Sequence, residues 1–203
     1  MTSVHRNVKV RVGAALIAAA TLGLLAAPAA QAAPSNVTNP NFETGDTSWN
    51  AFSTRPFGGP VITSAPGHPA RSGSWKAELG GHGVTGMDRI SQQITIPADR
   101  VPILTFWLRL DHPTPSTLGY HELTVEATAQ DGTPYTLTTR TNKDSNDAYQ
   151  KVTLTLPDAF FSTSVQNVGI SLFSVDDNTN RNPFLVDDVS MSYQIKWTPL
   201  PKP

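Results

Sequence analysis

The sequence has no cysteine, and this absence removes several kinds of chemistry at once. Its 203 residues contain no thiol nucleophile, no disulfide and no cysteine ligand for zinc. A chain without disulfides depends on its hydrophobic core for stability, and a bound metal ion can add to it. Internal repeats and a second domain are also missing, so we expect one domain of ordinary size.

Motifs of common hydrolases are missing too. The chain has no Gly-x-Ser-x-Gly sequence. His121 and Glu122 begin like a zinc-protease motif, but Val125 stands where the second histidine is needed. Glu122 and Glu126 would lie roughly 13 Å apart along one strand, which is too far for the carboxylate pair of a retaining glycosidase. We therefore expect a protein that is not an enzyme.

One stretch of the sequence resembles a calcium-binding loop but lacks a residue that such a loop requires. Residues 176–180 are rich in Asp and Asn, but Arg181 stands where such a loop requires glycine. This stretch is interpreted as a polar loop between strands.

The first 32 residues have the pattern of a secretory signal peptide of bacterial type. A basic segment with Arg6, Lys9 and Arg11 precedes an apolar run at 13–27 and small residues around Ala32. No adjacent arginine pair is present, which favours the general export route. A membrane anchor is the alternative, but the apolar run is short for a span. We predict cleavage after Ala32 and a secreted, extracellular protein.

The predicted mature chain is weakly acidic. Cleavage leaves 12 of the 15 basic residues against 16 acidic ones, a formal charge of 12 − 16 = −4. This balance argues against nucleic acid and anionic membranes as partners, and we expect a monomer.

Hydrophobic residues alternate with polar ones in short segments, which predicts strands rather than helices. Gly, Pro, Asn and Asp separate these segments, and Asp131-Gly132 is typical of a hairpin turn. The pattern predicts an all-β jelly-roll sandwich over 39–193, after a flexible start at 33–38 and before a Pro-rich tail at 194–203. The expected strands are 48–53, 61–63, 75–79, 90–96, 102–110, 120–130, 133–139, 151–156, 167–175 and 184–193.

Five blocks, in this order, resemble the secreted bacterial carbohydrate-binding modules that have a galactose-binding-like jelly roll. The blocks are residues 41–45 with Trp49, residues 72–77, residues 90–93 with 104–107, residues 149–154, and residues 184–190. Tyr149 stands where the family usually has Trp. The resemblance covers about 39–193 and implies a protein that binds polysaccharide or oligosaccharide, although the family also includes modules with no known ligand.

The resemblance also implies a structural calcium ion, held by Glu43 of the opening block and Asp187 of the closing one. Asp188 is the alternative ligand, because adjacent strand residues face opposite ways. Calcium prefers hard oxygen ligands such as these carboxylates. Without a metal, Glu43 would form hydrogen bonds within its own turn, and the Asp pair would lie on a solvated sheet edge.

Trp107 is the best candidate for a sugar platform. It is out of phase with the apolar face formed by Leu104, Phe106 and Leu108, and it lies beside Arg109. An aromatic ring beside hydrogen-bonding side chains is what a sugar groove needs. Glu122 and Thr124 are expected to share this surface, as are Glu126, Lys151 and Thr153.

Other tryptophans and other roles are less favoured. Trp49 and Trp75 match family positions that pack in the core, and Trp107 itself would otherwise cover a sheet edge. The leading hypothesis is a secreted, non-catalytic carbohydrate-binding protein. The alternative is an extracellular structural or protein-interaction module with the same fold and no sugar site, and a small hydrolase is a third.

Overall fold

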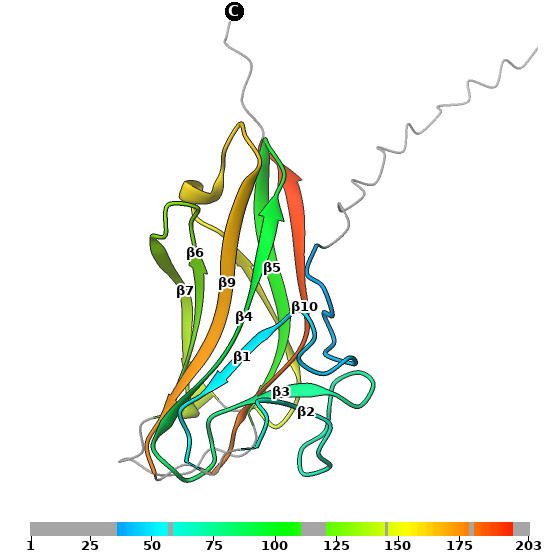
Figure 1. Ribbon diagram of the computed structural model, residues 1–203, viewed down its shortest axis with the longest axis vertical. Helices are drawn as coiled ribbons and strands as arrows, with labels where there is room; N and C mark the ends of the chain where they lie inside the picture. The colour runs from blue at the N-terminus through cyan, green and yellow to red at the C-terminus, as the bar shows by residue number, and fades with distance from the viewer. Residues whose placement is uncertain (1–35, 57–58, 111–120, 145, 179–180, 197–203) are drawn as a thin grey trace, which may run out of the picture. The chain divides into compact units, whose positions relative to one another are not determined.

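Two antiparallel five-stranded sheets form the part of the chain that the structure describes (Figure 1). The computed structural model describes residues 36–56, 59–110, 121–144, 146–178 and 181–196. The predicted signal peptide and most of the predicted tail lie outside these residues. Among the described residues, no helix has the length and apolar character needed to cross a membrane.

Each sheet is named here by its central strands. The β4–β9 sheet has the strand order β1 (Asn50–Ser53), β4 (Gly86–Ile96), β9 (Gln166–Asp176), β6 (His121–Thr128) and β7 (Pro134–Thr141). The β5–β10 sheet has the order β2 (Ile62–Thr63), β3 (Lys76–Leu79), β10 (Phe184–Ile195), β5 (Arg100–Leu110) and β8 (Gln150–Thr155). Two short 3-10 turns, η1 (Asn142–Asp144) and η2 (Asp158–Phe160), complete the elements.

All ten predicted strands are present, so the prediction of an all-β sandwich is confirmed. The strands at β4, β9 and β10 run longer than the apolar alternation indicates, because polar ends continue the backbone pairing. The Asp131-Gly132 turn joins β6 to β7, with Gly132 at φ 88° and its N–H donating to the Ala129 carbonyl. Positive φ is the conformation that glycine accepts without strain.

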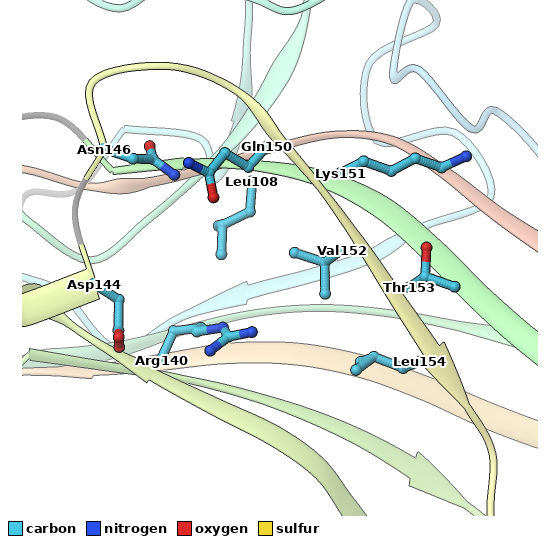
Figure 2. Close-up of a pocket in the computed structure, with 9 residues that line it drawn as sticks. All are labelled: Leu108, Arg140, Asp144, Asn146, Gln150, Lys151, Val152, Thr153 and Leu154. Carbon is cyan, nitrogen blue, oxygen red and sulfur yellow. The ribbon is translucent and has the colours of Figure 1, made fainter.

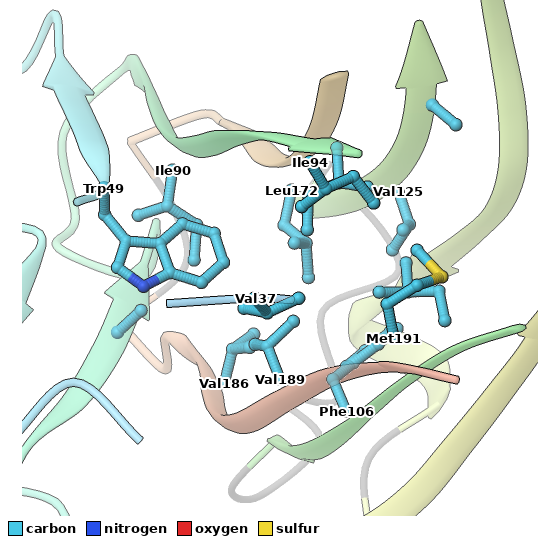
Figure 3. Close-up of a cluster of buried hydrophobic side chains, with 14 of the residues drawn as sticks. Val37, Trp49, Ile90, Ile94, Phe106, Val125, Leu172, Val186, Val189 and Met191 are labelled. Atoms are coloured by element: carbon cyan, nitrogen blue, oxygen red, sulfur yellow. The ribbon is translucent and has the colours of Figure 1, made fainter. Parts of the chain in front are cut away.

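The core lies between the sheets and follows the two-residue period of the strands. Along β5, alternate residues such as Phe106 are buried while Trp107 and its alternates are half-buried. Figure 3 shows side chains from both sheets meeting in this cluster. They include Ile90, Ile94, Val125 and Leu172 from the β4–β9 sheet, Phe106, Val186, Val189 and Met191 from the β5–β10 sheet, and Val37 and Trp49 from the opening segment.

Trp49 is a core residue, as the sequence predicts. It is buried, its ring packs 5.2 Å from that of Phe42, and its indole N–H donates to the Asn39 carbonyl at 2.9 Å. A buried indole N–H needs such a partner. This bond fixes the opening segment against the core.

A bulge interrupts the closing strand. Between Asp187 and Ser190, β10 uses one residue more than its partner β5, and Asp188 takes φ 48°. The bulge brings Val189 back to the core side after Val186. It also frees the Val189 N–H to donate to the Pro40 carbonyl at 2.8 Å, which ties the last strand to the opening segment.

The loop of residues 64–75, named here the covering loop, lies over the outer face of the β5–β10 sheet. Lys76 Nζ donates to the Ala65 carbonyl, and the Tyr149 hydroxyl donates to the Pro69 carbonyl at 3.1 Å. As a result Leu185 and Asp187, at outward positions of β10, are 0 % exposed. The outer face of the β4–β9 sheet has no comparable cover among the described residues.

The alternation along β5 predicts unequal costs for neighbouring substitutions. Phe106→Ala should lower the free energy of unfolding by about 3–5 kcal/mol, because it removes a fully buried ring and leaves a cavity. Thr105→Ala, on the outer side, should change it by less than about 1 kcal/mol. Urea denaturation of both variants measures this, and equal losses would contradict the orientation of β5.

Candidate functional site

The four residues predicted to bind sugar lie on two different sheets. Trp107 and Arg109 are on β5, whereas Glu122 and Thr124 are on β6 in the opposite sheet. All four occupy outward positions of their strands, so the two pairs face away from each other. The expectation of one shared surface is therefore wrong, because period-two alternation distinguishes inward from outward but does not say to which sheet a strand belongs.

Trp107 shares its surface with Lys151 and Thr153, as expected, because β5 pairs with β8. One face of its ring, however, is covered by Arg71 of the covering loop, with the guanidinium carbon 3.9 Å from the ring centroid. Arg71 also forms an ion pair with Asp188 at 2.5 Å. A sugar would have to displace this contact, and a role of Trp107 in sugar binding stays a prediction.

Glu43 and Asp187 are brought to the same place, the covering loop on either side of Gly73. Glu43 Oε1 accepts hydrogen bonds from the backbone N–H groups of Ser74 at 2.9 Å and Trp75 at 2.8 Å. Asp187 Oδ2 accepts from those of Arg71 at 2.8 Å and Ser72 at 3.0 Å. The arrangement is named here the two-carboxylate clamp.

Gly73 is required at the centre of this clamp. Its φ is 59°, and a Cβ there would overlap Glu43 Oε1. A side chain would therefore both strain the backbone and collide with the carboxylate. Glu43 does not stabilise its own turn, since its carboxylate bonds the covering loop, which is distant in sequence. A solvated sheet edge does not account for Asp187, since its side chain is buried.

The electrostatics of the clamp favour a cation. Burial raises the pKa of Asp187 to about 6, the hydrogen bond from Ser72 opposes this shift, and the neighbouring Asp188 carboxylate adds to it. The two carboxylates suit the hard-oxygen preference of calcium. Within the described ranges, however, no group of three or more His, Cys, Asp or Glu side chains is placed to hold a metal. Carbonyl oxygens and water would have to complete the shell.

The outer face of the β4–β9 sheet carries a different set of side chains. One row of paired residues crosses the sheet, with Phe52 on β1, Arg89 on β4, Phe173 on β9, Thr124 on β6 and Thr139 on β7. Phe52 is 44 % exposed, which is unusual for a phenylalanine. A depression of about 390 Å³ lies on this face, lined by Arg89, Gln93 and Glu126 among others.

Arg89 lines this depression and lies beside Phe52. Its guanidinium carbon is 6.0 Å from the ring centroid of Phe52, and its Nε is buried without a hydrogen-bond partner in the described part of the chain. Phe52 and the half-buried Trp75 line a second depression, of about 350 Å³. Trp75, however, belongs to the covering loop and packs against the core, as the sequence predicts, so the aromatic ring of the outer β4–β9 face beside Arg89 is that of Phe52.

Sequence reasoning does not find Phe52, Arg89 and Phe173. They come from three strands that are distant in sequence, and pairing alone brings them into one row. The signal that the sequence does carry is the shared parity of Arg89, Ser91 and Gln93 along β4, which indicates an outward polar row but not what lies beside it.

A cluster of buried polar side chains lies at inward positions near the ends of β4, β6 and β9. Asp88 bonds Arg55 Nε at 2.7 Å and the Gly80 N–H at 2.8 Å, and Asp176 Oδ2 accepts from the Gly81 N–H at 2.7 Å. Ser174 Oγ and Asp176 Oδ1 have no hydrogen-bond partner among the described residues. Asp176, expected to begin a polar loop, instead ends β9 as a buried residue, because the ladder with β4 continues to this position.

His121 belongs to this cluster and is a core histidine. Its ring packs 4.3 Å from that of Phe184, and burial lowers its pKa to about 4, so it is neutral at physiological pH. This position agrees with the rejection of a zinc-protease site.

Comparison with known proteins identifies the fold. No protein-family model and no curated protein matches the sequence. A family 61 carbohydrate-binding module solved with β-1,4-galactotriose has TM-score 0.55 and 15% identity, covering 78% of this chain and 98% of its own. A cyclase from Fischerella sp. TAU has TM-score 0.51 and 16% identity, covering 83% and 100%. A family 16 carbohydrate-binding module has TM-score 0.49 and 19% identity, covering 77% and 98%.

These similarities confirm the resemblance to carbohydrate-binding modules at the level of fold. The protein has the β-sandwich of such modules, and at these identities the likeness extends to fold alone. A cyclase shares the architecture, so the fold does not by itself decide between binding and catalysis.

The buried carboxylate of Asp176 predicts a pH-dependent effect. Burial raises its pKa from 3.8 to about 6, so the folded state holds the proton more tightly than the unfolded state. Ionisation of Asp176 therefore destabilises the folded state. The destabilisation is complete above about pH 6 and disappears as the pH falls to 3.8. At about 1.4 kcal/mol per pKa unit the effect is at most about 3 kcal/mol.

Asp176→Asn should therefore be more stable than the wild type at pH 7, with an advantage that shrinks between pH 6 and 4. His121 also titrates in both proteins, so stability is compared as the difference between them at each pH. Chemical denaturation at several pH values measures this, with the exposed Asp46→Asn as control. A difference that stays constant with pH would contradict the buried, ionisable state of Asp176.

Proposed function

We propose that this protein is a secreted, non-catalytic glycan-binding protein whose site is the outer face of the β4–β9 sheet. The observation that carries the proposal is the row from Phe52 through Arg89 to Phe173 and Thr124, with an exposed ring at one end. The opposite outer face is a weaker candidate, because the covering loop lies over it.

The chemistry of this face suits a sugar chain. An exposed ring such as Phe52 can pack against the apolar C–H face of a pyranose, and Arg89, Gln93 and Glu126 can bond its hydroxyl groups. The orphaned Nε of Arg89 gains the partner that a buried donor requires. The depression of about 390 Å³ is lined by residues of β1, β4, β6 and β9, and this extent favours an oligosaccharide over a single sugar.

Two of the predicted site residues remain in the proposed site. Glu122 and Thr124 lie on the same face along β6, where the Thr124 hydroxyl donates to Glu122 Oε1 at 3.0 Å. Trp107 and Arg109 lie outside it. The galactotriose complex of the family 61 module supports oligosaccharides as the ligand class.

Substitutions on the two outer faces should separate these alternatives. Phe52→Ala and Arg89→Gln should each weaken retention on polysaccharide affinity gels by about tenfold, the loss expected for one stacking or charge-assisted contact. Trp107→Ala, an aromatic at an outward position of the other sheet, is the matched control and should retain wild-type binding. Gels containing galactan, xylan and mannan test the ligand class.

The reverse result, with binding lost in Trp107→Ala and kept in Phe52→Ala, would place the site under the covering loop. Absence of retention on every polysaccharide would favour the interaction-module alternative. Release of reducing sugar during the assay would contradict the non-catalytic part of the proposal.

We further propose that the two-carboxylate clamp holds a structural calcium ion. Glu43 and Asp187 would supply carboxylate oxygens, and the ion would neutralise a carboxylate whose burial otherwise disfavours ionisation. Glu43 Oε1 and Asp187 Oδ2 bond the covering loop, and Asp187 Oδ1 accepts from the Asp188 N–H at 2.7 Å. The ion would therefore bind Glu43 Oε2 and the remaining lone pairs of Asp187.

Calcium should therefore raise the melting temperature. An ion that binds only the folded state adds about 2.7 kcal/mol at 100 times its dissociation constant. Thermal melting in calcium and in excess chelator should differ by several degrees for the wild type, and Glu43→Gln and Asp187→Asn should lose most of this response. Identical wild-type melts, with no metal found by elemental analysis, would contradict the proposal.

A further inference from the structure

The sandwich is open on one side, between β7 at the edge of one sheet and β8 at the edge of the other. A cleft of about 530 Å³ lies there, apart from the outer face of the β4–β9 sheet and from the two-carboxylate clamp (Figure 2). Its lining combines an apolar floor of Leu108, Val152 and Leu154 with polar residues, which are Arg140, Asp144, Asn146, Gln150, Lys151 and Thr153.

Arg140 occupies an inward position, which is unusual for a charged residue. It pairs with Leu123, whose side chain is fully buried in the core, and cross-strand partners share one face of a sheet. Figure 2 shows the guanidinium directed into the cleft, over the side of the floor formed by Val152 and Leu154. The side chain is half-buried, so part of its hydration is lost.

No described residue pairs with the Arg140 guanidinium. Asp144 is the acid that lines the same cleft, but it forms no ion pair with Arg140. Its Oδ2 instead accepts hydrogen bonds from the Thr141 N–H at 2.7 Å and the Thr141 hydroxyl at 3.3 Å. A half-buried guanidinium without a partner among the described residues, whose donors form a fork that matches a carboxylate, points to an anionic ligand.

The polar rim of the cleft is held in place. The N–H groups of Asn146 and Asp147 donate to the Leu110 carbonyl at the end of β5, at 3.2 and 3.3 Å. Asn146 Oδ1 accepts from the Ala148 N–H at 3.3 Å, which leaves its amide N–H₂ group available. Gln150 begins β8 and pairs with Leu108 of the floor. These amides stand at fixed positions beside the guanidinium.

We propose that this cleft binds a uronic acid, a sugar whose ring carries a carboxylate. The carboxylate would bond Arg140, the hydroxyl groups would bond Asp144, Asn146 and Gln150, and the C–H face would lie on Leu108 and Val152. Four hydrogen-bonding side chains around a small aliphatic floor favour a hydroxylated ligand over a fatty acid or the carboxyl terminus of a peptide. The site is separate from the proposed glycan face and does not depend on it.

The ligand series isolates the carboxylate. Titration calorimetry of the purified protein at pH 7 should detect galacturonic or glucuronic acid. The methyl ester of the same acid and the neutral sugar should bind at least about tenfold more weakly, because each keeps the hydroxyls and loses the charge-assisted pair.

The protein series isolates Arg140. Arg140→Gln should lose at least about tenfold in affinity for the acid, and Arg140→Lys should retain part of it because it keeps the charge without the fork. Lys151 also lines the cleft, but its side chain is exposed and extends away from Arg140 (Figure 2). Lys151→Gln, which removes a charge of the same sign, should therefore stay within about twofold of wild type. Phe52→Ala should bind the acid normally, which distinguishes this site from the proposed glycan face.

Melting temperatures near that of the wild type establish that the variants fold. If Arg140→Gln does not fold, Arg140→Lys still tests the proposal. Equal affinity for the acid and its ester, or unchanged affinity in both Arg140 variants, would overturn the proposal. So would binding of a peptide carboxyl terminus in the absence of any uronic acid binding.

Discussion

The buried carboxylate of Asp187 is the constraint on which the arrangement of this sandwich depends. It lies at an outward position of β10, between β3 and β5, where a side chain would ordinarily meet water. A buried carboxylate needs hydrogen-bond donors, and the covering loop supplies them through the Arg71 and Ser72 N–H groups. Glu43, in the opening segment, accepts hydrogen bonds from the same loop through the Ser74 and Trp75 N–H groups. Residues near both ends of the domain therefore hold one loop.

The clamp makes the two outer faces unequal. Over the β5–β10 sheet, the covering loop buries Leu185 and places Arg71 on the ring of Trp107. Over the β4–β9 sheet, Phe52 remains exposed and Arg89 keeps a donor without a partner. In a two-sheet architecture either outer face can carry a ligand, and here the loop that covers one face leaves the other exposed.

The sequence predicts what depends on local pattern and misses what depends on pairing. Each of the ten strands can be located because apolar alternation is a local property, and the opening block assigns Trp49 to the core. The family resemblance places Glu43 and Asp187 together, and they do act on one loop. The prediction that joins Trp107 to Glu122 is wrong, because nothing local to β5 or β6 states that the chain changes sheets between them.

Polar residues at inward positions are the hardest to predict, and they differ in how their bonding is completed. Asp88 is satisfied by Arg55 and the Gly80 N–H, so its burial is explained within the fold. Arg140 sits in β7, where threonines and half-buried positions blur the alternation, so no local pattern singles it out. A charged group that loses part of its hydration and gains no partner costs free energy in the isolated protein. No described residue supplies a partner for the half-buried Arg140 guanidinium, and a bound anion would supply one at the open side of the sandwich. The proposed ligand therefore follows from the guanidinium and not from the size of the cleft.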